Sequence, residues 1–333
     1  MSESVEVWPP VDLINGLAIE APTPEKELDA NVFKELPKGT EVVSINPSGT
    51  SAWVQTVCIE TSQKDGRILK FFKKVRRDQT RLILYRAVGY LVNGTQNQRG
   101  PLGRRMMVGT YESEQAIHTY LPANVPKPIA WGAYRDDPDM YYYLAEFRDM
   151  VADKVPDPIR VVDAVVQLHR QSSGKSPNGK FGFHVVTHLA NIPNKAGWED
   201  TWERHFTNAL TAMMEIESRA QNNHDGDFED LKRKTLELVV PRLLRPLETG
   251  GRKVTPCLIH TDLWPGNCMP DADTDQVVLF DSCAMWGHHE ADLGSWRAPR
   301  YRMGRPFIKE YQKKMGMDFP VNDWDDRNLL YAM

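Results

Sequence analysis

The sequence predicts an α+β protein with two lobes, a small antiparallel β-sheet followed by a mostly helical part. Two observations support this prediction. The first part of the chain alternates short runs of β-branched and aromatic residues with turns rich in Gly, Pro, Asn and Asp. Beyond residue 148 the apolar residues recur instead at a spacing of three to four, as on one face of a helix. A β-rich part followed by a helical part indicates two lobes with a boundary near residue 148.

We divide the chain into three parts. Residues 1–27 are rich in proline and polar residues, which predicts a poorly ordered lead-in. Residues 28–147 form the predicted N-terminal lobe, with helices around 29–36 and at 106–121 and strands at 41–45, 52–60, 67–75, 127–134 and 140–146. Residues 148–333 form the predicted C-terminal lobe, with helices at 159–170, 198–219 and 228–244.

Size and composition argue against several classes of function. The 333 residues can bury a sizeable core, and a net charge of -4 leaves no electrostatic footprint for nucleic acid. The acidic N-terminus does not resemble a targeting signal, and no run approaches the roughly 20 apolar residues that span a bilayer. The four cysteines are scattered without a CxxC pair, which predicts reduced thiols rather than disulfides or a structural zinc site. We therefore expect a cytoplasmic enzyme without a membrane or nucleic-acid partner.

The chemistry is predicted to lie in the segment from His260 to Asn267, which has the spacing H-x-D-x4-N. In phosphoryl transfer, an Asp accepts the proton of the attacking hydroxyl and a nearby Asn holds Mg²⁺. Fourteen residues further on, an apolar run ends in Asp281. A β-hairpin of that length would bring Asp281 beside Asp262, where it can bind the Mg²⁺ that bridges nucleotide phosphates. Each residue alone is weak evidence, but together they indicate a small-molecule kinase.

On these residues the chain resembles the fructosamine-3-kinase family, also called ketosamine-3-kinase or protein-ribulosamine 3-kinase. That family belongs to the aminoglycoside phosphotransferase and choline kinase branch of the protein-kinase-like fold. The resemblance covers about residues 29–331 with one interruption, and it is nearest to fungal-type members. The motifs that carry it are HTDLWPGN at 260–267, FD at 280–281, WGHHE at 286–290, FGFHVVT at 181–187, WEDTW at 198–202, VPKPI at 125–129 and EFRDM at 146–150.

The resemblance implies transfer of phosphate from ATP, with Mg²⁺, to the sugar 3-hydroxyl of ketosamines. These substrates are small molecules or glycated proteins. By position, Asp262 would be the catalytic base, and Asn267 and Asp281 the Mg²⁺ ligands. Trp264 could stack on a sugar face or pack as a core aromatic residue. His288 could reach the substrate, although a structural role fits it better.

The N-terminal lobe should bind the nucleotide. The family pattern selects Lys74 for the phosphates, and strand alternation places Lys73 on the opposite face. Ser48, Gly49 and Thr50 lie between the first two strands, where a loop would cover the phosphates. Glu146 and Phe147 form the hinge-like segment beside the nucleotide.

Three features depart from the family pattern. The register of residues 106–109 puts Thr110 where the family has the Glu that pairs with the lysine, although a shift of the helix could bring Glu112 or Glu114 to Lys74. Residues 76–101 look like an insertion of about 25 residues, either a lineage-specific loop or a gene-model error. The chain also stops within a predicted helix at residues 325–333, which would leave the C-terminal lobe short of part of its packing.

Two alternatives remain open at this point. One is a kinase of the same branch that acts on an aminoglycoside or a choline-like alcohol. The other is a catalytically weakened or silent nucleotide-binding protein, for which Thr110 is the main argument. The sequence does not select the preferred ketosamine. It also leaves the oligomeric state open, with a monomer slightly favoured.

Overall fold

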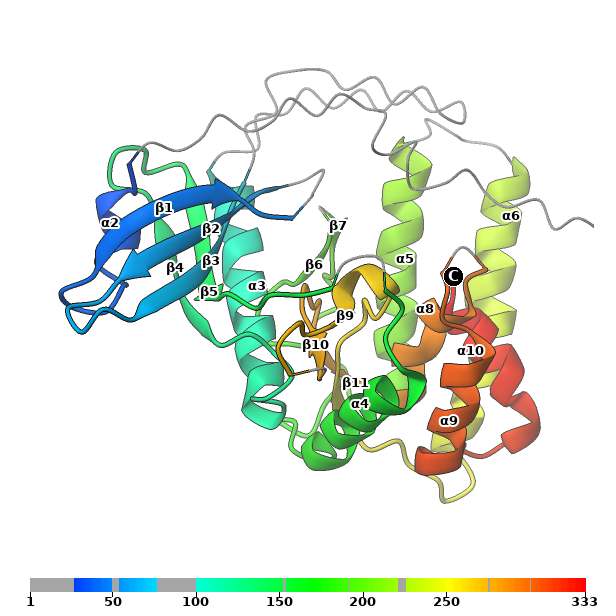
Figure 1. The fold of residues 1–333 in the computed structure, drawn as a ribbon. Coiled ribbons are helices and arrows are strands. Elements are labelled where there is room, and N and C mark those ends of the chain that lie inside the picture. The colour runs from blue at the N-terminus through cyan, green and yellow to red at the C-terminus, as the bar shows by residue number, and fades with distance from the viewer. Residues whose placement is uncertain are drawn as a thin grey trace, which may run out of the picture.

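A five-stranded antiparallel sheet forms the first lobe of the computed structural model (Figure 1). The structure describes residues 27–49, 54–76, 100–151, 154–190, 192–220, 226–274, 276–299 and 301–333. The strand order is β1-β2-β3-β5-β4. The strands are β1 (Glu41–Pro47), β2 (Val54–Ser62), β3 (Ile68–Arg76), β4 (Pro128–Ala133) and β5 (Tyr141–Glu146). The predicted antiparallel sheet and its five strands are confirmed.

The central strand β3 carries Lys74 in the middle of the sheet. Lys74 pairs with Thr56 on β2 and with Tyr143 on β5. The short helix α2 (Ala30–Phe33) packs near β4, and Asp29 caps it by accepting a hydrogen bond from the N–H of Asn31 at 2.8 Å. Residues 1–26 of the predicted lead-in (1–27) and residues 77–99 of the predicted insertion (76–101) lie outside the described residues.

Helix α3 (Pro101–Tyr120) connects the two lobes and begins five residues earlier than predicted. Its Met106 and Met107 are buried against Tyr143 and Ala145 of strand β5. Gly109 permits a close approach to the second lobe, since a Cβ atom there would lie 2.6 Å from the carbonyl oxygen of Val186. The helix therefore carries contacts from the sheet to the second lobe.

The second lobe is built mainly of helices, which gather on the side of the molecule away from the sheet (Figure 1). Asp157 caps helix α4 by accepting hydrogen bonds from the N–H groups of Ile159 and Arg160, and α4 turns Val161, Val165 and Leu168 into the core. The helices are α4 (Pro158–Ser172), α5 (Trp202–Ala220), α6 (Gly226–Lys234), α7 (Val240–Leu244), α8 (Gly294–Arg297), α9 (Arg305–Met315) and α10 (Trp324–Tyr331).

One difference from the predicted helices has a physical reason. The single helix expected at 228–244 is divided into α6 and α7 by a π-helical turn at Thr235–Val239, just before Pro241, which has no N–H to donate. The last predicted helix is α10, which buries Trp324, Arg327 and Leu330 in the lobe.

Three two-stranded antiparallel sheets lie between the five-stranded sheet and the helices (Figure 1). Strand β8 (Cys257–Ile259) pairs with β11 (Met285–Gly287), and β9 (Cys268–Pro270) pairs with β10 (Val277–Leu279). The third pairs β6 (His188–Leu189) with β7 (Ile192–Pro193). The predicted hairpin that returns the chain to Asp281 is therefore confirmed. The predicted lobe boundary at residue 148 falls between β5 and α4.

Candidate active site

The loop after strand β8 is held by one buried carboxylate, that of Asp292. Its two oxygens accept the backbone N–H of His260 at 2.9 Å and of Thr261 at 2.6 Å. Thr261 has a left-handed backbone, with φ of 66°, so two outside hydrogen bonds stabilise a conformation that is uncommon for a non-glycine residue. Burial raises the pKa of Asp292, but the hydrogen bond and charge of His169 and the N–H of His260 outweigh it and hold this pKa below its usual value. Sequence reasoning missed Asp292.

Asp262 lies at the bend that this loop makes. Its carboxylate accepts a hydrogen bond from the side-chain amide of Asn267 at 2.8 Å. Burial raises the pKa of Asp262 to about 6, and the neighbouring charge of Asp281 acts in the same direction. A carboxylate with this pKa is ionised at neutral pH and is more basic than an ordinary Asp, as general-base catalysis requires.

Asn267 and Asp281 are brought to Asp262 by the β9–β10 hairpin. The short 3₁₀ turn Pro265–Asn267 leads into β9, and the N–H of Phe280 donates to the carbonyl of Asn267 at 3.1 Å. The Asn267 amide nitrogen is used by Asp262, and its side-chain oxygen takes part in no hydrogen bond among the described residues. That amide oxygen and the half-exposed Asp281 carboxylate are oxygen donors of the kind that Mg²⁺ prefers. The two predicted metal ligands therefore fit such an ion.

Lys74 reaches the second lobe and forms an ion pair with Asp281. Its neighbour Lys73 points to the other face of the sheet, where it donates to the hydroxyl of Tyr134 at 2.9 Å. Lys70 is paired with Glu60 at 3.3 Å. Of the three lysines on β3, the one that sequence reasoning selected is the one that contacts Asp281.

Glu114 corrects the predicted register of helix α3. Its carboxylate is buried and accepts hydrogen bonds from the N–H and hydroxyl of Ser282, the residue after Asp281. Burial, together with the charge of Asp281, raises the pKa of Glu114 to about 7, although the hydrogen bonds of Ser282 and the charge of Lys74 oppose the rise. Glu114, and not Thr110 one turn earlier, is thus the α3 residue whose charge lies near Lys74. Glu112 points elsewhere and pairs with His184 at 3.0 Å.

The structure shows where most of the other predicted nucleotide-binding residues lie, but no contact that it describes links them to Asp262, Asp281 or Lys74. Ser48 and Gly49 begin the turn after β1, where the N–H of Ser48 donates to the carbonyl of Thr56 at 3.0 Å. Thr50 lies outside the described residues. Glu146 ends β5, and the N–H of Phe147 donates to the carbonyl of Lys70 at 3.3 Å. Their roles toward a nucleotide remain predictions.

The two predicted substrate residues differ in exposure. Trp264 is half-buried in the catalytic loop and stacks on Tyr301, with ring centroids 5.5 Å apart. A Cβ atom on Gly266 would lie 2.1 Å from the Trp264 ring, so a glycine is needed beneath the indole. His288 is fully buried, with ring nitrogens bonded to Tyr331 and Asp318. It therefore has no exposed surface to offer a substrate, and the structural role is the one observed.

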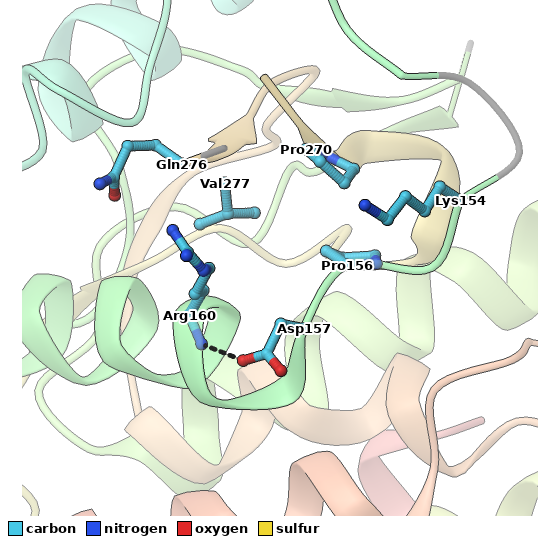
Figure 2. A pocket seen from close by; sticks show the side chains of 7 residues that line it. All are labelled: Lys154, Pro156, Asp157, Arg160, Pro270, Gln276 and Val277. Carbon is cyan, nitrogen blue, oxygen red and sulfur yellow. Dashed lines mark hydrogen bonds between the residues drawn. The ribbon is translucent and has the colours of Figure 1, made fainter. Parts of the chain in front are cut away.

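A separate cavity of about 260 Å³ lies between the start of α4 and the β9–β10 hairpin (Figure 2). Lys154, Pro156, Asp157 and Arg160 line it from the helix side, and Pro270, Gln276 and Val277 from the hairpin. No predicted site residue lines this cavity. Within the described part of the chain, no helix has both the length and the apolar character needed to cross a membrane.

Comparisons with solved structures support the fold. A fructosamine-3-kinase candidate from Thermobifida fusca superposes with a TM-score of 0.63 and 18% identity, over 92% of this chain and 89% of that chain. The aminoglycoside phosphotransferase APH(4)-Ia, in a ternary complex with AMP-PNP and hygromycin B, gives a TM-score of 0.54 at 11% identity, over 91% of this chain and 86% of that chain. These likenesses confirm the two-lobed protein-kinase-like fold.

Comparisons of sequence identify the family. Protein-ribulosamine 3-kinase of Oryza sativa is 25% identical over 233 residues, which are 70% of this chain and 63% of that protein. Ketosamine-3-kinase of Mus musculus is 32% identical over 116 residues, 34% of each chain. The chain thus spans less than two thirds of the length of the rice relative. The likeness to fungal members remains a prediction. The profile described as fructosamine kinase matches residues 97–333, and the chain belongs to the fructosamine kinase family.

Proposed function

We propose that this protein is an ATP-dependent kinase that phosphorylates the 3-hydroxyl of ketosamines, either free or on glycated proteins. The observation that carries the proposal is the convergence of Asp262, Asn267, Asp281 and Lys74 from both lobes at one place. The names of the rice and mouse relatives supply the substrate class.

Asp262 has the geometry and the pKa of the base in this reaction. It would accept the proton of the sugar hydroxyl while the hydroxyl oxygen bonds to the γ-phosphorus of ATP. The bond between the γ-phosphorus and its bridging oxygen breaks, which releases ADP. Asn267 orients Asp262 through its amide, and Asp292 holds the backbone on which Asp262 stands.

Lys74 would bind the nucleotide phosphates once bound ATP separates the lysine from Asp281. Asn267 and Asp281 would hold Mg²⁺, which neutralises charge on the transferred phosphoryl group when bound. Glu114 supplies a second carboxylate near Lys74. It would take the role of the family's Glu that pairs with the lysine, which the sequence could not assign to one residue. The Trp264–Tyr301 stack lies in the same region and would provide an aromatic face for the sugar ring.

The alternatives lose support from the same geometry. The main argument for the silent-protein hypothesis was Thr110, and Glu114 lies near Lys74 in its place. No contact of the described residues favours an aminoglycoside or a choline-like alcohol over a ketosamine. We further propose a cytoplasmic location, because all four cysteines are buried and free, as is usual in a reducing compartment. A monomer remains a prediction.

The test is ATP·Mg²⁺ turnover by the full chain with fructoselysine and ribuloselysine, followed by ³¹P NMR of the product. We expect a phosphate ester on the sugar 3-oxygen. Hygromycin B and choline serve as competing acceptors. Faster turnover of either competitor would contradict the substrate class.

The matched variants are Asp262→Asn and Asp136→Asn. Asp136 is an exposed Asp of the first lobe, and among the described residues its carboxylate pairs only with Arg135 at the surface. We expect Asp262→Asn to lose turnover and Asp136→Asn to keep it. Equal turnover in the parent and in Asp262→Asn would overturn the assignment of the base.

A further inference from the structure

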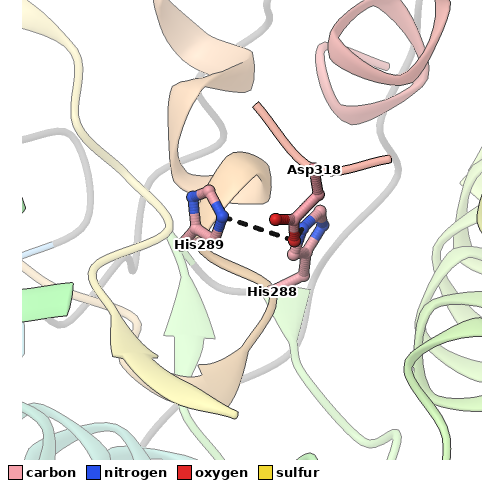
Figure 3. A group of neighbouring side chains, drawn as sticks. All are labelled: His288, His289 and Asp318. Atoms are coloured by element: carbon pink, nitrogen blue, oxygen red, sulfur yellow. Dashed lines mark hydrogen bonds and ion pairs between the residues drawn. The ribbon is translucent and has the colours of Figure 1, made fainter. Parts of the chain in front are cut away.

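His288, His289 and Asp318 form a cluster of metal-binding type in the C-terminal lobe, outside the catalytic loop (Figure 3). One ligand atom from each residue lies within 4.8 Å of the other two. The Oδ2 atom of Asp318 is 3.0 Å from Nε2 of His288 and 3.5 Å from Nε2 of His289. A four-coordinate ion with bonds of about 2.0–2.2 Å places its ligands roughly 3.3–3.6 Å apart. The two distances from Asp318 lie in or just below this range.

The cluster is assembled from two elements that are distant in the sequence. The histidines follow strand β11 at the start of the 3₁₀ helix His289–Leu293, and Asp318 lies in the segment between α9 and α10. Both imidazoles are largely covered, whereas the Asp318 side chain is 45% exposed. An ion from solvent would therefore reach the cluster from the side of the exposed Asp318 carboxylate.

A tyrosine holds each histidine at its other nitrogen. Nδ1 of His288 lies 2.9 Å from the Tyr331 hydroxyl, and Nδ1 of His289 lies 3.0 Å from the Tyr311 hydroxyl. Both rings are thereby oriented with Nε2 toward Asp318. Metal-binding histidines are usually fixed in this way by a partner at the second ring nitrogen.

A row of hydrogen bonds leads from His289 to the catalytic loop. The Tyr311 hydroxyl lies 3.0 Å from Nδ1 of His289 and 2.7 Å from Nδ1 of His169, and Nε2 of His169 lies 3.0 Å from Asp292. The row begins at the Asp318 carboxylate and ends at that of Asp292.

This row needs one positive charge. An ionised carboxylate only accepts hydrogen bonds, whereas a neutral imidazole and a phenol each donate one. If His169 donates to Asp292 and Tyr311 donates to His169, then His289 must donate from Nδ1. Its Nε2 then turns a bare lone pair toward the Asp318 carboxylate. Either an additional proton in the row or a metal ion at that lone pair removes the repulsion.

The charged groups around the cluster do not neutralise Asp318, so a cation there would be favoured. Glu290 is 4.0 Å from Nε2 of His288, but both of its oxygens are bonded to the buried Arg327, at 2.8 Å and 3.1 Å. That pair is neutral as a whole. Asp318 therefore contributes the one uncompensated charge of the cluster.

We propose that Nε2 of His288, Nε2 of His289 and the Asp318 carboxylate bind one divalent transition-metal ion of the Zn²⁺ class. Two imidazoles and one carboxylate suit such an ion better than Mg²⁺ or Ca²⁺, and a water completes the coordination. His288 binds as its Nδ1–H tautomer, because the Tyr331 oxygen can accept that proton. The site is separate from the proposed kinase chemistry and does not depend on it.

The experiment measures metal binding by the full chain, stripped with chelator and kept in excess Mg²⁺ without nucleotide. Zn²⁺ is titrated calorimetrically, and Co²⁺ reports four-coordinate geometry through its visible absorption. We expect one Zn²⁺ per chain, a Co²⁺ spectrum of the four-coordinate type, and a rise in melting temperature with Zn²⁺.

Asp318→Asn is the decisive variant, because the half-exposed side chain can be changed with little loss of packing. We expect its Zn²⁺ affinity to fall by more than the roughly 10–100-fold that the loss of an outer partner costs. Glu112→Gln is the matched control, since Glu112 pairs with His184 at 3.0 Å without a third ligand, and it should bind like the parent. Circular dichroism confirms that each variant is folded.

Either of two results overturns the site. One is a parent chain that binds no Zn²⁺, which assigns the charge to a proton. The other is an Asp318→Asn variant that binds Zn²⁺ as tightly as the parent. Since the measurement uses neither ATP nor ketosamine, its failure leaves the proposed kinase activity untouched.

Discussion

Asp262 and Asp292 flank the same loop and have opposite electrostatic environments. Burial and the neighbouring charge of Asp281 raise the pKa of Asp262 to about 6, although the side chains of Asn267 and Trp264 act to lower it. Asp292 is more deeply buried, yet two backbone N–H groups and His169 hold its pKa below the usual value. Burial alone therefore does not decide the protonation of a carboxylate; the donors aimed at it and the sign of the neighbouring charges also do. We infer that the less buried side of the loop, at Asp262, serves the reaction, whereas the fully buried side, at Asp292, stabilises the loop.

The largest expected effect is on activity, at Asp262. We expect Asp262→Asn to lower kcat/KM by about 10²–10⁴-fold, because the general base is lost. Its free energy of unfolding should not fall, since the amide can still accept from Asn267 and an unfavourable charge is removed. Steady-state kinetics and urea unfolding measure the two quantities. If Asp262→Asn lost activity because its free energy of unfolding fell, the proposed difference between Asp262 and Asp292 would be wrong.

The supporting carboxylate should give the reverse pattern. Asp292→Asn replaces an ionised acceptor by an amide that cannot serve two N–H groups and His169 at once. We expect its free energy of unfolding to fall by about 3–5 kcal/mol, as for other broken buried charge pairs. Urea unfolding at neutral pH checks this. If the free energy of unfolding fell no more than in the surface variant Asp136→Asn, the loop would not need Asp292 for its conformation.

Glu114 sharpens the comparison from the other side of the site. Its pKa rises from 4.5 to about 7 on folding, so the folded state is increasingly disfavoured as pH rises between these values. Glu114→Gln removes that penalty and keeps an oxygen for Ser282. At pH 8 we expect the variant to be more stable than the parent by roughly 1–3 kcal/mol. The difference should disappear below pH 4.5, and unfolding at both pH values tests it.

The smallest expected effect is the pH dependence of the parent enzyme. Asp262 must be ionised to accept a proton, so kcat/KM should fall about tenfold per pH unit below its pKa of about 6. An ordinary Asp would show the same fall only near pH 4. A pH profile of kcat/KM distinguishes the two. Activity that stays level down to pH 4.5 would mean that burial does not raise this pKa.

Much of the fold followed from local patterns. Alternating β-branched residues predicted the strands, and the short connection from Asn267 to Asp281 predicted the β9–β10 hairpin. Strand alternation separated Lys74 from Lys73. These predictions succeeded because each depends on residues that are neighbours in the chain, where periodicity and turn chemistry act directly.

The start of helix α3 was harder. Pro101 at its first turn is a helix-start signal, but it closes a breaker-rich stretch that was assigned to a loop. The predicted helix therefore began five residues late, and Thr110 was placed where Glu114 lies. The signal that could have found Glu114 was the single acidic residue on the buried face of α3, beside Ser113 and Ile117.

The sequence by itself determined that Asp262, its amide partner Asn267 and the second carboxylate, Asp281, come together, since they belong to one loop and one hairpin. Only the tertiary structure decided what surrounds them. Asp292 is about 30 residues from the backbone it holds, Glu114 is 168 residues from Ser282, and Lys74 is 207 residues from Asp281. Such pairs leave no local pattern, because the packing of helices and strands from both lobes, and not the chain, sets their separation in space.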